Sequence, residues 1–369
     1  MNNKIIIIGI IFILLFTINF SLNNSHASLN ALYQVPIILV NNENVSTPNP
    51  FQQMIQLNES NYKGYIIYNG SFANFEFVYN NGTVIPAWIE SNNSGKLIIW
   101  LKINSILALS SETIYLDIFS RNDNLLNASG KNGIGEAPQL SPTYAEYDNG
   151  ANVFDMYFNG NTPLSDFNFE GNTGTQASVT GPTGTTINVI SITGYASNFG
   201  FVYTATSLTN QPIIAESSSQ QAGNQAGGTG ADNGQVSIVS GISTSGLNAI
   251  SVDMGWGSSY FTNDYYSSGT QTAGVNQQGT ADTNWHYASV TYFGSSATSW
   301  SGYIAPQLYS TSGGYSGSVS NNPLSSSSTL YLGLIGIVDS IDQWQTYINW
   351  MRARAYPPNG VMPSVEVIA

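Results

Sequence analysis

The chain has 369 residues, of which 42% are hydrophobic and 8% charged, and it contains no cysteine. This length predicts two folded domains, and the missing cysteines exclude disulfides, thiolate metal sites and cysteine nucleophiles. The net charge is -13 and no Lys or Arg lies between Lys131 and Arg352, so we expect no nucleic-acid partner.

The N-terminal segment has the pattern of a secretory signal peptide. Lys4 precedes an apolar run over residues 5–16, and the small residues Ser25 and Ala27 suit cleavage after Ala27. We therefore predict a signal peptide over residues 1–27 and an extracellular or cell-surface protein. The alternative is a retained membrane anchor, although the run is shorter than the roughly 20 residues that span a bilayer. Membrane contact is expected only through this segment, if it stays uncleaved.

Asn-x-Ser/Thr triplets are confined to the first part of the mature chain. If they carry glycans, they must lie on the surface. Chance is an equal explanation in a chain so rich in Asn and Ser. The candidate glycosylation sites are Asn44, Asn58, Asn69, Asn81, Asn92 and Asn127.

Residues 30–125 are predicted to form a β-sandwich. Short alternating strands are separated by turn sequences such as those at 80–82 and 92–95, and no window keeps a 3.6-residue period. The apolar strand over 96–103 is expected to be buried. The stretch 126–142, rich in Asn, Gly, Pro and Ser, is predicted to be a linker.

Residues 143–365 are predicted to form a two-sheet jelly roll. About ten short strands alternate with loops rich in Gly, Ser and Asn. The longest loop is expected over 217–234, and the one helical candidate is 340–349. The predicted fold class is thus all-β, an N-terminal β-sandwich followed by a jelly roll.

Residues 33–119 resemble the archaeal and bacterial DUF2341 family. The resemblance is carried by Tyr-Gln-Val-Pro-Ile at 33–37, by the block 74–91 with its Ile-Pro-Ala-Trp-Ile-Glu, and by Leu-Ile-Ile-Trp-Leu-Lys-Ile at 97–103. It implies an extracellular β domain without a settled activity.

The second segment resembles the concanavalin A-like, laminin G-like jelly rolls. The similar stretches are 284–292, 329–333 and the last strand, Trp-Met-Arg-Ala-Arg-Ala-Tyr at 350–356. The resemblance implies binding of glycans or proteins. Such domains often hold calcium, but this chain shows no clustered Asp-x-Asp pattern.

Catalytic chemistry finds little support. His286, the one histidine of the mature chain, lies on an expected core strand, where a structural role is favoured over a catalytic triad. A glycosidase needs two carboxyl groups. The nearest pairs are Glu146 with Asp148 and Asp339 with Asp342, which are better explained as turn and cap residues. We expect no enzyme.

A candidate calcium site surrounds the turn at 149–150. Calcium prefers six to eight oxygen ligands, and Glu146, Asp148, Asn149 and Asp155 supply oxygens there. The alternative is a solvated turn. Calcium is the one cofactor that the sequence suggests.

Aromatic residues within a Ser- and Gly-rich region form the candidate ligand site. Tyr260, Phe261, Tyr265 and Tyr266 are expected in a loop, where aromatic rings can stack on sugars. Packing in the core is the alternative.

The sequence therefore predicts a secreted or cell-surface recognition protein without catalytic activity. Its expected partner is a glycan or a cell-surface protein, as in adhesion. The second hypothesis is a structural surface-coat or filament subunit that self-associates through sheet edges. The third, disfavoured, is a carbohydrate-active hydrolase.

Overall fold

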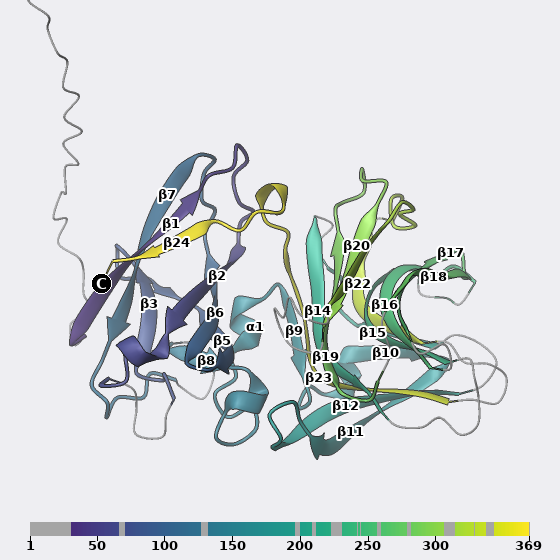
Figure 1. Ribbon diagram of the computed structural model, residues 1–369, viewed down its shortest axis with the longest axis horizontal. Helices are drawn as coiled ribbons and strands as arrows, with labels where there is room; N and C mark the ends of the chain where they lie inside the picture. Colours follow the sequence, from purple (N-terminus) through teal and green to yellow (C-terminus); the bar gives the residue numbers. More distant parts are fainter. Residues whose placement is uncertain are drawn as a thin grey trace, which may run out of the picture.

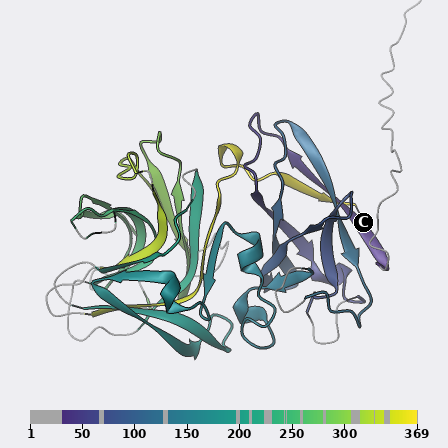
Figure 2. The same ribbon diagram turned by 180° about the vertical axis from the view of Figure 1, so that it is seen from behind.

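The computed structural model describes residues 31–65, 71–126, 132–195, 200–208, 212–222, 231–241, 243, 245–256, 260–278, 282–305, 314–327, 329–336 and 343–368. Within these residues the strands form four sheets, stacked in pairs into two sandwiches that lie side by side (Figures 1 and 2). The all-β prediction of two successive sandwiches is confirmed. The predicted signal peptide lies outside the described residues, and none of the described helices is long and apolar enough to cross a bilayer.

The smaller sandwich pairs a five-stranded sheet with a four-stranded one. The five-stranded sheet has the order β24 (Ser364–Val367), β1 (Tyr33–Asn41), β7 (Ser110–Ile118), β3 (Phe75–Tyr79) and β4 (Val84–Ile85). The four-stranded sheet has the order β2 (Phe51–Asn58), β6 (Lys96–Ile103), β5 (Ala87–Asn93) and β8 (Ile134–Glu136).

The larger sandwich is the jelly roll. Its seven-stranded sheet has the order β10 (Phe167–Glu170), β13 (Gly200–Thr204), β22 (Tyr331–Gly336), β15 (Ala231–Ser240), β16 (Asn248–Trp256), β17 (Tyr260–Ser267) and β18 (Thr270–Gln278). Its other sheet has the order β11 (Asn172–Thr180), β12 (Thr186–Tyr195), β23 (Gln343–Ala355), β14 (Ile213–Gln221), β19 (Trp285–Tyr292), β20 (Trp300–Ala305) and β21 (Tyr315–Val319), and β9 (Met156–Asn159) also pairs with β23.

Helical structure is confined to short turns. The one α-helix among the described residues is α1 (Gly150–Val153), which lies between the two sandwiches (Figure 1). Single 3-10 turns occur at η1 (Glu59–Asn61), η2 (Pro138–Leu140), η3 (Leu164–Asp166) and η4 (Pro358–Gly360).

Strand β6 carries apolar side chains on both of its faces because both faces are covered. Leu97, Ile99 and Leu101 point into the core between the two sheets of the smaller sandwich. Trp100, on the opposite face, is buried in a separate cluster that includes residues of the jelly roll. A strand that is covered on both faces loses the polar alternation of a half-exposed strand.

The predicted linker over 126–142 is partly a structural element of the smaller sandwich. From Ile134 to Ala137 the chain is buried, and β8 runs parallel to β5. The backbone of Ala137 donates to the carbonyl of Ile89 at 2.7 Å. Its polar, Gly-containing composition suggested a loop, but sheet pairing satisfies its backbone groups.

The jelly roll does not extend to residue 365 as expected. Strand β24 pairs antiparallel with β1, with Val367 opposite Ile37. After the jelly roll, residues 364–367 therefore return to the smaller sandwich and complete its five-stranded sheet.

Two local predictions in the jelly roll were wrong. The helical candidate at 340–349 is, from Gln343 on, part of β23, because buried Trp344, Thr346 and Ile348 alternate with half-buried residues. The expected loop over 217–234 contributes to β14 and β15. Ser219 is buried there and donates to Oε1 of Gln235 at 2.8 Å, so a Ser-rich run can lie in a core.

We predict that the protein is more stable at pH 5 than at pH 8. Glu76 lies opposite Asp117 on neighbouring buried strands, and burial together with that charge raises the pKa of Glu76 to about 7. Burial also raises the pKa of Glu136 to about 7. The folded state keeps these protons up to about pH 7, whereas the unfolded state releases them near 4.5. Stability should therefore fall as pH rises through this window, by up to about 3 kcal/mol per group.

Thermal unfolding at the two pH values measures this effect. Glu76→Gln should reduce the difference in Tm, whereas Glu146→Gln, at an exposed position, should leave it unchanged. A Tm that is equal or higher at pH 8 would contradict the prediction.

Candidate functional site

The two sandwiches meet through the outer faces of β2, β5 and β6 on one side and β14, β19 and β23 on the other. A β-bulge in β23 lies at the start of the part of this strand that contacts the smaller sandwich. Ser218 pairs with Trp350 but Ser219 pairs with Ile348, so Asn349 is an extra residue. Ile348 lies in the jelly-roll core, whereas Trp350 packs against Trp88 of the smaller sandwich. The bulge thus turns the second half of β23 toward the other domain.

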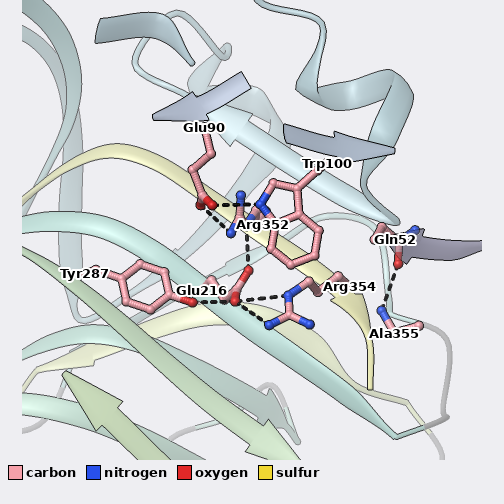
Figure 3. Close-up of polar contacts among 8 residues, drawn as sticks. All are labelled: Gln52, Glu90, Trp100, Glu216, Tyr287, Arg352, Arg354 and Ala355. Carbon is pink, nitrogen blue, oxygen red and sulfur yellow. Dashed lines mark hydrogen bonds and ion pairs between the residues drawn. The ribbon is translucent and has the colours of Figure 1, made fainter. Parts of the chain in front are cut away.

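Arg352 joins the two domains through a buried double ion pair (Figure 3). Its Nη2 contacts Oε1 of Glu90 from β5, and its Nε lies 2.6 Å from Oε2 of Glu216 from β14. All three side chains are 0% exposed. Nε1 of Trp100 donates to the other oxygen of Glu90 at 2.7 Å. The charge of Arg352 is therefore neutralised by carboxylates from both sandwiches.

Glu216 has further partners within the jelly roll. Arg354 donates to its Oε1 through Nη2 at 2.8 Å and through Nε at 3.0 Å, and the hydroxyl of Tyr287 donates to the same oxygen. Burial by itself would raise the pKa of Glu216, but the charges of Arg352 and Arg354 outweigh it and lower the pKa to about 2. Glu216 therefore stays ionised across the physiological pH range.

Aromatic rings enclose the guanidinium of Arg352. Its Cζ lies 4.5 Å from the ring centroid of Phe154, 4.8 Å from that of Trp350 and 5.0 Å from that of Trp100. Cation–π attraction strengthens when the cation is desolvated, so these rings replace part of the water that the arginine loses.

Further hydrogen bonds cross the same boundary. Oε1 of Gln52, in β2, accepts from the backbone of Ala355 at 2.9 Å, at the end of β23 (Figure 3). Trp88 donates to Oδ1 of Asp148 at 2.7 Å. With β24 paired to β1, these contacts hold the sandwiches in one arrangement.

A cleft opens beside this cluster, between the two sandwiches. Its volume is about 950 Å³. Amide and hydroxyl side chains from both domains line it, namely Gln56, Ser91, Asn92, Asn93, Ser94, Gln139, Thr183, Ser218 and Asn284. Lys96 is the one cationic side chain among the described lining residues, and Glu90 is the one carboxyl group.

Trp285 supplies the accessible aromatic surface of the cleft. Its side chain is half-buried, and its Nε1 donates to the carbonyl of Thr180 at 2.9 Å, which fixes the indole. Trp350 and Tyr287 also line the cleft but are buried. Because these two residues also belong to the interdomain cluster, the cluster forms the floor of the cleft.

His286 lies at the edge of the cleft with its ring packed on Phe261. Its Nδ1 is 2.9 Å from the carbonyl of Asn284. Burial lowers its pKa, although the charge of Asp282, whose Oδ1 is 3.5 Å from Nε2, acts in the opposite direction. These contacts give the histidine a packing role.

The four candidate calcium ligands do not form a cation site. The carboxylate of Asp148 accepts from Trp88, Tyr157, Asn159 and the backbone of Gly150. Its oxygens thus face donors, an environment that suits an anion and repels a cation.

The other three proposed ligands are placed differently. Asp155 accepts from Gln52 at 3.1 Å, Asn149 is buried and Glu146 is exposed. Within the described ranges, no group of three His, Asp or Glu side chains could hold a metal ion.

The predicted aromatic loop is a strand. Tyr260, Phe261, Tyr265 and Tyr266 belong to β17, where Phe261 is in the core and Tyr266 is fully buried. Tyr265 is half-buried and packs against the core. The Ser and Gly neighbours suggested a loop, but the segment pairs with β16 and β18. Phe261 lies in the core of the sandwich, and Tyr266 belongs to a separate buried cluster that includes Leu247. Phe261 and Tyr266 are therefore not accessible to a ligand, and the surroundings of the Tyr260 side chain lie outside what the structure describes.

The described sequon asparagines are all exposed. Asn44, Asn58, Asn81 and Asn92 lie in or beside turns of the smaller sandwich. Asn69 and Asn127 fall outside the described residues. Asn44, Asn58 and Asn81 are open to an attached glycan, whereas Asn92 lines the cleft.

One curated protein gives a strong sequence match. The chain is 51% identical, over 333 residues and 89% of its length, to uncharacterized protein 562 of Sulfolobus islandicus rod-shaped virus 1. It spans 58% of the length of that relative. No protein-family model matches the chain, so the resemblance to DUF2341 stays a prediction.

Solved structures that are similar to part of this chain include carbohydrate-binding proteins and an enzyme. Basic winged bean lectin, solved with Tn-antigen, is 8% identical with a TM-score of 0.36, covering 58% of this chain and 98% of the lectin. The Bacillus subtilis module CBM66 is 12% identical with a TM-score of 0.32, and the match covers 51% of this chain and 98% of the module. The endo-β-1,4-glucuronan lyase of Trichoderma reesei is 9% identical with a TM-score of 0.38, and the match covers 57% of this chain and 100% of the lyase. Likeness at this level does not identify a ligand.

Sequence reasoning missed the interdomain cluster, although a signal was present. Arg352 and Arg354 are the only Lys or Arg residues after Lys131, and they stand two apart among apolar residues of a core strand. Two charges on one face of such a strand require buried carboxylates. Their partners, Glu90 and Glu216, could not be chosen from spacing alone.

We predict that Arg352→Met destabilises the protein by about 3–5 kcal/mol, because Glu90 is left as a buried charge without its ion pair. Adding Glu90→Gln should recover part of this loss. Urea unfolding of the single and double variants measures both effects. Lys63→Gln removes an exposed charge and should change stability by less than about 0.5 kcal/mol. An Arg352→Met variant as stable as this control would refute the assigned role.

Proposed function

We propose that the chain binds a glycan in the cleft between the two sandwiches. The observation that carries this proposal is the lining: neutral amide and hydroxyl side chains surround one fixed, half-buried indole, that of Trp285. The volume of about 950 Å³ is in the range of ligand sites and accommodates a short saccharide.

The lining matches the chemistry of sugars. Sugar hydroxyls both donate and accept hydrogen bonds, and the side-chain amides of Gln56, Asn93 and Asn284 also do both. The apolar C–H face of a pyranose can stack on the indole of Trp285. A hydrophobic ligand would instead leave the amides without partners.

Binding is favoured over hydrolysis. A glycosidase needs two carboxyl groups about 5–9.5 Å apart. The described lining contributes Glu90 alone, and Arg352 and Trp100 already hold that carboxylate. A recognition role therefore fits the cleft better than the carbohydrate-active hydrolase.

The proposed recognition takes place outside the cell, at a cell surface. The predicted signal peptide over 1–27 and the exposed sequon positions support this location. A surface glycan, free or carried by a surface protein, is then the partner class.

A glycan array probed with the labelled full chain tests the proposal. Trp285→Ala should weaken binding to the glycans that the wild type selects by more than about tenfold, the effect of truncating a central aromatic contact. Tyr115→Ala removes a half-buried ring on β7, outside the cleft, and should retain binding. Binding that survives Trp285→Ala, or a wild type that selects no glycan, would reject the cleft as a glycan site.

A further inference from the structure

Strand β11 is an edge strand with open backbone groups. It forms the end of its sheet, along the lower rim of the jelly roll in Figure 1, and the same rim is seen from behind in Figure 2. All nine of its residues pair with β12 without a register shift. Among the described residues, β12 supplies the only backbone partners of residues 172–180, and Nε1 of Trp285 donates to the carbonyl of Thr180 at one end of the strand. About half of its N–H and C=O groups thus face outward.

The composition of β11 lacks the features that normally prevent pairing at a sheet edge. Charged residues, proline and bulges serve this purpose in other proteins. The sequence Asn-Thr-Gly-Thr-Gln-Ala-Ser-Val-Thr contains no charge and no proline, and Thr and Val favour strands. Its length of nine residues also distinguishes it from short edge strands.

Other edges in the structure are blocked. Strands β24 and β10 each carry a glutamate, namely Glu366 and Glu170, and in the three-residue β8 the backbone of Glu136 donates to the carbonyl of Tyr147. Strand β4 has two residues. Residues 355–363 run beside β2, and Gln53 donates to the carbonyl of Pro363 there. Strands β18 and β21 contact each other at the far side of the jelly roll.

We propose that β11 pairs antiparallel with β11 of a second copy of this chain. A register centred on Gln176 places Gln176 opposite its own counterpart at a two-fold axis and Gly174 opposite Ser178. It leaves the carbonyl of Thr180 with Trp285. No pair in this register brings like charges together, and no residue larger than Gln is involved. The two eight-stranded sheets then form one continuous sheet.

The dimer has a consequence for the cleft. A two-fold axis between antiparallel strands is perpendicular to the sheet, so both copies turn the same sheet face to the same side. Gly181, Pro182 and Thr183, directly after β11, line the cleft. Both clefts therefore open on one side of the dimer, an arrangement that strengthens binding to a surface that carries several copies of the glycan. This consequence rests on the proposed glycan binding, whereas the pairing itself does not.

Cross-linking through a single introduced cysteine tests the pairing. The chain has no cysteine of its own, so Gln176→Cys provides one thiol per copy. Residues directly opposite across antiparallel strands have Cβ atoms about 4.5–5.5 Å apart, close enough for a disulfide after small adjustments. Under mild oxidation the full chain should become mostly a covalent dimer. Ser111→Cys, at an exposed position on the internal strand β7, should stay mostly monomeric.

Light scattering of the uncross-linked full chain gives an independent readout. Wild type should show twice the mass of one chain. Gln176→Lys, which places two lysines opposite each other, should stay folded, show the mass of one chain and unfold at a lower Tm, because dimerisation stabilises the native state by mass action. Equal cross-linking of the two cysteine variants, or an unchanged mass for Gln176→Lys, would overturn the proposal. Glycan binding by a monomeric wild type would leave the proposed function intact while refuting the dimer.

Discussion

The buried guanidinium of Arg352 is the constraint on which the arrangement of the two sandwiches depends. A charge inside a protein must be paired, because its transfer from water costs several kcal/mol even after relaxation. Arg352 meets one carboxylate from its own domain, Glu216, and one from the other, Glu90. If the sandwiches separated, Glu90 and Arg352 would lose each other, and the rings of Trp88, Trp100 and Trp350 would be exposed together. The interface is therefore comparable to a domain core rather than to a transient contact.

This constraint also defines the cleft. Glu90, Tyr287 and Trp350 belong both to the interdomain cluster and to the cleft lining. A ligand would contact residues of both sandwiches on a floor that the ion pairs hold in place. Preorganisation of this kind reduces the entropy that binding must overcome. The same cluster that stabilises the interface thus gives the proposed site its shape.

The sequence predicted the fold class well and the site poorly. Period-two patterns and turn signals, such as the one at Gly82, depend on neighbouring residues and can be read locally. The aromatic run at 260–266 and the oxygen-rich turn at 146–155 were interpreted from composition, but their environments depend on strands far away in the chain. Tyr266 is buried by tertiary packing, and Asp148 is surrounded by donors from β5 and β9. The cleft combines residues from 56 to 350. No local pattern specifies such a surface, because the bulge at Asn349 and the return of β24 to β1 create it.

Differential scanning calorimetry of the full chain tests most directly whether the two sandwiches form one cooperative unit. The Arg352 cluster, the buried β8 and the pairing of β24 with β1 all predict a single unfolding transition, with a calorimetric enthalpy equal to the van't Hoff enthalpy. Two separate transitions, with the jelly roll unfolding independently of the smaller sandwich, would contradict the account.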